Sequence, residues 1–187
     1  MAVWINEFHY DNVGTDAGEF IEVAGTAGTD LGGWSIVRYN GNVPGAAVVY
    51  TTPGSTLLSG VIADQQNGFG TISVSLPANG LQNGPADGFA LVDGGGTVVQ
   101  FLSYEGVITA ADGPAAGLTS TDIGISQAGT EPLGASLHLT GSGDDYADFT
   151  WAATADDSPG AVNAGQSFGG VVTTTVSIGD AGVLEGN

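Results

Sequence analysis

The chain opens with the stretch VWINEFHYDNVGTDAGEFIEVAGTAGTDLGGWSIVRYNG, residues 3–41, which carries the strongest signal for its fold. Three short runs in it, Val3–Phe8, Glu19–Val23 and Trp34–Tyr39, are rich in β-branched and aromatic residues. The glycine, asparagine and aspartate between them would break any helix longer than about two turns. Both faces of the first run carry apolar side chains, as in strands that are covered on both sides. This stretch therefore predicts an antiparallel β-sandwich.

The same alternation of short apolar runs and turn residues continues along the chain. Further strands are expected at Ala46–Thr51, Gly70–Leu76, Gly88–Val92 and Val98–Tyr104, with weaker ones at Thr121–Ile125, Ser136–Leu139 and Asp148–Ala152. Asp93–Gly96 lies between two apolar runs and predicts a hairpin turn with positive φ. Many short strands at regular spacing are typical of a sandwich or barrel, here with long glycine-rich loops.

Charge and composition exclude several classes of function. The 187 residues include 20 acidic ones and a single basic one, Arg38, which gives a formal net charge of −19. There is no cysteine and no lysine, so disulfides, zinc–thiolate sites, cysteine nucleophiles and lysine-dependent phosphate loops are absent. A surface this negative repels phosphate backbones, so no direct binding of nucleic acid is expected.

The composition also indicates a compartment. Only 11% of the residues are charged, whereas glycine numbers 33. Such lysine-free, aspartate-rich sequences are typical of secreted bacterial β-proteins, so we expect a secreted, extracellular or cell-surface protein. No apolar run approaches the roughly 20 residues needed to cross a bilayer, and membrane insertion is not expected. Strand-like sequence begins directly after Met1 and Ala2, and we interpret Met1 as a start that replaces a removed leader.

Several motifs occur in the order found in lamin-tail domains of secreted bacterial proteins. They are Asn6-Glu7, Glu19–Glu22, Asp30–Trp34, Ala90–Asp93 and Phe101–Tyr104. On these motifs residues 3–106 resemble that family, and the resemblance implies an immunoglobulin-like sandwich. The later segment Ser158–Asn163 resembles the version found beside extracellular nucleases, which implies a nuclease or phosphoesterase domain elsewhere in the parent protein.

The end of the chain has its own pattern. Gly160–Gly170 is interpreted as a connector that ends the domain, so we expect one domain over residues 1–168 and a linker with further sequence over 169–187. Within that tail Val171–Ile178 alternates between valine or isoleucine and polar residues. It resembles the opening strand of a Calx-beta domain, which would begin a following β-domain. The alternative is a last strand of the present domain. The role of residues 107–170 is left open by the resemblance.

Two acidic clusters are candidate calcium sites, because calcium takes six to eight oxygen ligands. The candidate ligands are Asp11, Asp16 and Glu19 in the first cluster, and Asp144, Asp145 and Asp148 in the second. A third cluster, Asp156, Asp157 and Ser158, could also hold calcium. The first cluster does not have the spacing of an EF-hand loop. The alternative is that these residues are solvated acidic loops stabilised by Asx turns.

The sequence gives little support for catalysis. It has two histidines, His9 and His138, and no G-x-S-x-G nucleophile elbow. Glu22 lies between apolar residues and would suit a carboxylic acid of raised pKa, although a strand glutamate that accepts a backbone N–H is the simpler reading. A small hydrolase would need a deep pocket that joins a histidine and a carboxylate.

The sequence thus predicts a non-catalytic binding or anchoring domain of a larger secreted bacterial protein. The expected partners are neighbouring domains of the same chain and a cell-surface or extracellular polymer or protein. The alternative is a calcium-stiffened structural module of an adhesin, a biofilm protein or a surface-layer protein.

Overall fold

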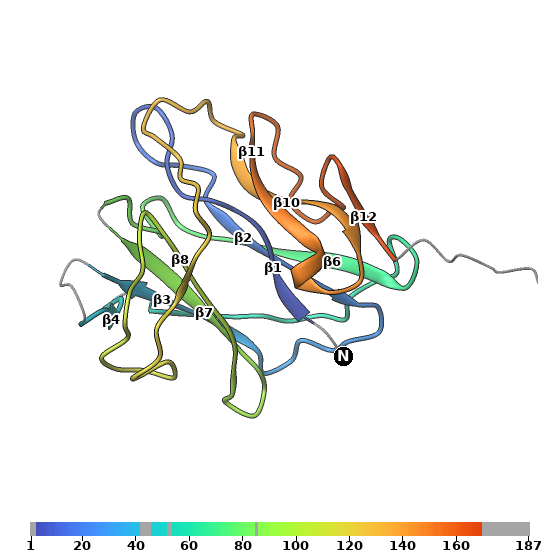
Figure 1. Cartoon of the computed structure of the whole chain (residues 1–187), viewed down its shortest axis with the longest axis horizontal. Helices are drawn as coiled ribbons and strands as arrows, with labels where there is room; N and C mark the ends of the chain where they lie inside the picture. The colour runs from blue at the N-terminus through green and yellow to red at the C-terminus, as the bar shows by residue number, and fades with distance from the viewer. Residues whose placement is uncertain (1–2, 42–45, 52–53, 85, 170–187) are drawn as a thin grey trace, which may run out of the picture.

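The protein is an all-β, immunoglobulin-like sandwich in which two sheets pack face to face (Figure 1). The computed structural model describes residues 3–41, 46–51, 54–84 and 86–169. The first sheet contains β1 (Val3–His9), β2 (Phe20–Thr26), β6 (Phe69–Ser75), β10 (Ser136–Gly143), β11 (Phe149–Thr154) and β12 (Gln166–Phe168). The second contains β3 (Ser35–Asn40), β4 (Val48–Val49), β5 (Ser55–Leu57), β7 (Asp87–Val92), β8 (Val98–Tyr104) and β9 (Thr121–Asp122).

Apart from two parallel pairings, the strands pair antiparallel. The first sheet runs in the order β11-β10-β1-β2-β6, and the second in the order β4-β3-β7-β8-β9. The parallel pairs are β12 on β10 and β9 on β8. The one helical element in the described residues is the 3₁₀ turn η1 (Tyr146–Asp148), so that part of the chain contains no helix long and apolar enough to span a membrane.

The main core lies between the two sheets. Ile5, Phe8 and Ile21 of the first sheet face Phe89 and Leu102 of the second, and all five are almost fully buried. The rings of Phe8 and Phe89 meet edge to face at 5.0 Å between centroids. Each side chain of this size stabilises the fold by about 1.5–3 kcal/mol through burial alone. Strand β1 is buried along its whole length, as the apolar character of both its faces predicts.

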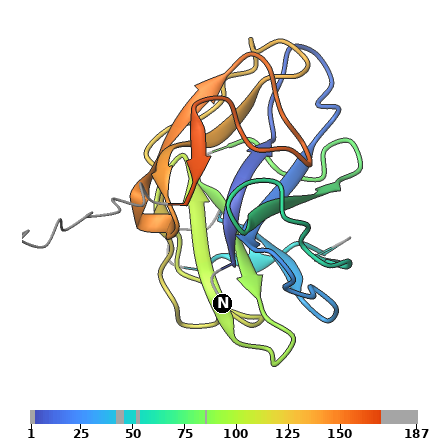
Figure 2. The same ribbon diagram turned by 90° about the vertical axis from the view of Figure 1, so that its right-hand side faces the viewer.

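A second apolar layer covers the outer face of the first sheet. Trp4 packs there against Phe149 and Phe168, with ring centroids 5.9 Å and 6.1 Å away. Ser158 and Gly160 hydrogen-bond to Glu7 and Glu22 on this face, and β12 then pairs in parallel with β10 through Gly141 and Gln166. The turned view shows the C-terminal strands together on this side of the molecule (Figure 2). The described part of Gly160–Gly170 therefore belongs to the sandwich, which corrects its interpretation as a connector.

The predicted strands largely match the observed ones, with differences at the weakest segments. Ala46–Thr51 contracts to β4, and Thr121–Ile125 contracts to β9. Strands β5 and β12 were not expected from the sequence. The hairpin turn between β7 and β8 is confirmed: the Asp93 carboxylate accepts the N–H groups of Gly95 and Thr97, and Gly96 has φ 84°. The predicted strand Val171–Ile178 lies outside the described residues.

The sandwich has an open edge where β1 of the first sheet approaches β8 of the second. Strand β1 pairs with β10 only at Glu7 and Phe8, and the register shifts between Ile5 and Glu7. Its first half therefore diverges from β10. The N–H of Ile5 donates instead to the side-chain oxygen of Gln100 in β8, at 2.8 Å. This bond ties the two sheets together at one edge of the sandwich.

Candidate functional site

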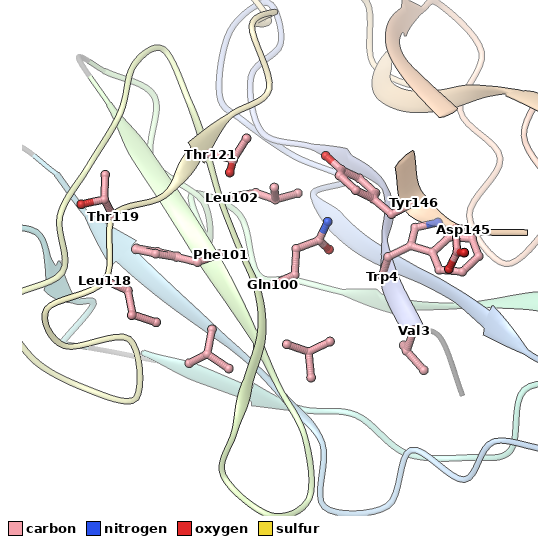
Figure 3. A pocket seen from close by; sticks show the side chains of 12 residues that line it. Val3, Trp4, Gln100, Phe101, Leu102, Leu118, Thr119, Thr121, Asp145 and Tyr146 are labelled. Atoms are coloured by element: carbon pink, nitrogen blue, oxygen red, sulfur yellow. The ribbon is translucent and has the colours of Figure 1, made fainter. Parts of the chain in front are cut away.

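A groove of about 550 Å³ lies at this edge (Figure 3). Its lining comprises Val3 and Trp4 of β1, residues 98–102 of β8, Leu118, Thr119 and Thr121, and Asp145 with Tyr146 at η1. Most of these side chains are apolar or aromatic, and Asp145 is the one formally charged residue in the lining. Mostly apolar concave surfaces with a few polar groups are typical of ligand sites.

One wall of the groove is the outer edge of β8. Strand β7 pairs with β8 along one side, from Val98 to Tyr104. On the other side β9 pairs only with Leu102 and Ser103. Within the described part of the chain, residues 98–101 therefore have no strand partner on that side. Val99 is the extra residue of a β-bulge, because Val98 and Gln100 oppose the consecutive residues Val92 and Leu91.

The opposite wall is formed by β1 and η1. Trp4 is 3% exposed, and its indole nitrogen Nε1 has no hydrogen-bond acceptor among the described residues. The hydroxyl of Tyr146 accepts the indole N–H of Trp151 at 2.9 Å, which fixes the Tyr146 ring beside the groove. The first half of β1, which pairs with β2, and this bonded tyrosine form the wall.

The three aspartates of the second candidate calcium cluster lie in one turn at the rim of the groove. Oδ2 of Asp148 accepts the backbone N–H groups of Asp144 and Asp145, at 3.1 Å and 3.0 Å. All three aspartates are exposed. The Asp148 carboxylate thus stabilises the turn, while Asp145 adds negative charge to the groove.

The members of the first candidate cluster divide between two roles. The Asp11 and Asp16 carboxyls lie together with the Asn83 amide, which donates to Oδ2 of Asp16 at 3.3 Å. Burial, reinforced by the neighbouring Asp16, raises the pKa of Asp11. Glu19 instead accepts the N–H groups of Gly80 and Leu81, and burial raises its pKa to about 7. Among the described residues, no three Asp, Glu, His or Cys side chains gather closely enough to hold a metal ion.

The sequence did not reveal a buried polar network on the outer face of the first sheet. Glu7 and Glu22 are cross-strand partners, and both are fully buried. Glu7 accepts hydrogen bonds from Ser136 and Ser158, whereas Glu22 accepts from the Asn6 amide and the Gly160 N–H. The two glutamates thereby fasten residues 158–160 to the sheet. Glu22 does accept a backbone N–H, from Gly160 far along the chain, and burial also raises its pKa to about 8, so both readings of this residue hold.

The histidines lie away from the groove. His9 hydrogen-bonds Gln127 and Asn12, each at 3.1 Å, and is buried at the end of β1. His138 is buried in β10, and burial lowers its pKa. Neither lines the groove. The third cluster, Asp156 to Ser158, is divided too: Ser158 belongs to the Glu7 network, and Asp156 is exposed.

Arg38, the single basic residue, is also buried. Its guanidinium donates to the Gly80 carbonyl and to Thr56, at 2.6 Å and 3.3 Å, and lies over the Tyr50 ring. Burial lowers its pKa, and the nearby Glu19 opposes that shift. Because this cation is 0% exposed, the formally charged side chains at the surface are acidic.

These features define an immunoglobulin-like sandwich with an apolar, acid-rimmed groove where its two sheets open. No family model, curated protein or solved structure matches the chain. The lamin-tail and Calx-beta resemblances thus remain predictions from the sequence motifs.

Proposed function

We propose that the chain is a non-catalytic binding and anchoring domain of a larger secreted bacterial protein. The observation that carries this proposal is the groove between β1 and β8, which combines a mostly apolar lining with one carboxylate, Asp145, from an exposed acidic turn. A groove of this volume and character suits recognition of a ligand or chain segment. Its single carboxylate, Asp145, has no histidine beside it in the lining, which favours binding over hydrolysis.

The surface charge supports a restricted set of partners. With the one basic residue buried, the surface repels nucleic acid, attracts basic partners and does not repel neutral ones. A cell-surface or extracellular protein or polymer meets this condition. If the parent protein bears a nuclease or phosphoesterase domain, as the lamin-tail resemblance implies, this domain tethers that enzyme without touching its substrate.

The test is co-sedimentation of the purified domain with the cell-surface and secreted fractions of the producing organism. Leu118→Asp places a charge in the groove, and Leu57→Asp makes the same change at an exposed position on β5. We expect the wild type and Leu57→Asp to co-sediment, and Leu118→Asp to remain in the supernatant. Equal binding by all three proteins, or binding by none, would contradict the proposal.

A second candidate is a calcium-stiffened structural module of an adhesin, biofilm or surface-layer protein. The observation in its favour is the meeting of Asp11, Asp16 and Asn83, whose side-chain oxygens are ligands that calcium prefers. Its test is thermal unfolding in EDTA and in millimolar CaCl₂ at matched ionic strength. A calcium-specific rise that Asp11→Asn abolishes supports this candidate, and a rise that NaCl reproduces contradicts it.

A further inference from the structure

We propose that the groove binds an extended peptide segment of alternating basic and apolar residues, which adds as a strand to the open edge of β8. This inference rests on the proposed binding function and specifies its partner. The occupant is a segment of another protein or domain, in β conformation, that continues the second sheet beyond β8.

The backbone of β8 supplies the first argument. Residues 98–101 are paired with β7 on one side, and no described strand pairs with them on the other. A strand edge of this kind leaves N–H and C=O groups free to bond an incoming chain. Strand β9 already pairs in parallel with the adjoining Leu102 and Ser103. An added segment would therefore extend the strand pairing on this side of β8 from Leu102 to residues 98–101.

The groove itself supplies the second argument, because side chains of a strand alternate between two faces. The apolar lining around Phe101 and Leu118 would receive every second side chain of the added segment (Figure 3). The four open residues of β8 span roughly 13 Å at the usual rise per residue, enough for two such side chains on one face. A glycan would fill the groove without using the backbone edge, which is why a peptide fits better.

Charge supplies the third argument and selects among peptides. Asp145 lines the groove, and Asp144 and Asp148 lie beside it in the same turn, all three exposed. The one basic residue of the chain, Arg38, is buried and offers no competing cation. A second copy of this chain, also at −19, would be repelled from the groove. A segment with lysine or arginine on its outward positions is attracted instead.

The probe is a seven-residue synthetic peptide that alternates lysine and valine, titrated by isothermal calorimetry. Its comparison peptides replace every lysine by glutamate, or the fourth and fifth residues by proline. We expect the glutamate peptide not to bind, and the proline peptide to bind about tenfold more weakly, since it loses one or two backbone hydrogen bonds. Binding of the alternating peptide should weaken as NaCl is raised, because salt screens the acidic rim.

Amide hydrogen exchange then locates the bound peptide. Strand addition predicts new protection of amides within residues 98–101, which Leu118→Asp abolishes and Leu57→Asp keeps. If the peptide binds without new protection in β8, strand addition is wrong although the groove still binds. If the peptide fails to bind at millimolar concentration while the wild-type domain co-sediments with the surface fractions, the peptide inference is overturned and the anchoring function stands. Failure of both assays overturns both proposals.

Discussion

At the scale of single residues, the buried glutamates are the least expected feature of the protein. Glu7 and Glu22 face each other across β1 and β2, and the residue opposite Glu7 in β10 is His138, whose pKa burial lowers. Burial raises the pKa of Glu22 to about 8, and it raises the pKa of Glu7 as well. Glu22 therefore keeps its proton at neutral pH. The hydrogen bonds that Ser158 donates to Glu7 and that Gly160 donates to Glu22 offset the cost of burying the two carboxyl groups beneath residues 158–160.

This arrangement predicts that the protein loses stability as pH rises. The pKa of Glu22 in the folded state, about 8, lies above its ordinary value of 4.5. Its contribution is complete below pH 4.5 and is lost as pH rises through 8, a loss on the order of 5 kcal/mol. Glu19, with a pKa raised to about 7, adds a loss in the same direction. Urea unfolding at pH 5, 7 and 9 measures the slope.

The variant Glu22→Gln isolates the contribution of this one carboxyl group. An uncharged amide of the same shape should flatten the pH dependence. Because the amide has one acceptor oxygen for the two N–H groups of Asn6 and Gly160, it should also cost about 1–3 kcal/mol at every pH. Asp156→Asn, at an exposed position, is the matched control and should keep the wild-type slope. A Glu22→Gln protein with the same slope as the wild type would show that Glu22 does not titrate in this range.

At the scale of elements, the last strand decides how far the domain extends. Phe168 in β12 is fully buried against Trp4, Phe69 and Phe149. Phe168→Ala should therefore destabilise the protein by about 3–5 kcal/mol, the usual cost of a large cavity. Val107→Ala, at an exposed site, should change stability by less than about 0.5 kcal/mol. Equal unfolding midpoints in urea for the two variants would mean that β12 is not part of the cooperative unit.

The long strands could be predicted from the sequence because local pattern and tertiary packing agree in them. Val3–Phe8 and Val98–Tyr104 nearly coincide with β1 and β8. Strand β12 was not predicted, because a three-residue strand between glycines is too short to show the alternation of apolar and polar residues that marks a strand. The groove escaped too, since it arises where the bulges at Asn6 and Val99 shift strand register. Such shifts depend on what lies across the sheet, which a single sequence does not show.

The candidate site residues show the same division between local and long-range information. The acidic clusters were visible as sequence runs, and the structure does bring Asp11 and Asp16 together. It also shows Glu19 and Asp148 bonded to backbone N–H groups, from Gly80 in one case and Asp145 in the other. Composition alone does not distinguish a carboxylate that holds a loop from one that is free to bind a ligand.

At the scale of the whole molecule, the dominant physical feature is uncompensated negative charge. The formal net charge of the sequence is −19, and Arg38 is buried, so it does not offset the negative charge at the surface. Like charges repel more strongly in the compact state than in the expanded unfolded chain, so they oppose folding. An added cation or a rise in salt should relieve that repulsion. The same repulsion disfavours self-association and leaves the acid-rimmed groove free for a basic partner.

We therefore expect NaCl to stabilise the protein. Raising NaCl from about 20 mM to 500 mM shortens the screening length several-fold and should raise Tm by on the order of 5 °C at pH 7. The gain should shrink at pH 4, where protonation of exposed carboxylates has already reduced the charge. This NaCl curve is also the baseline for calcium, because a specific site adds RT ln(1 + [Ca²⁺]/Kd) above screening at equal ionic strength. A Tm that falls or stays constant with NaCl would show that surface repulsion does not limit stability, and the charge argument for a basic partner would lose its support.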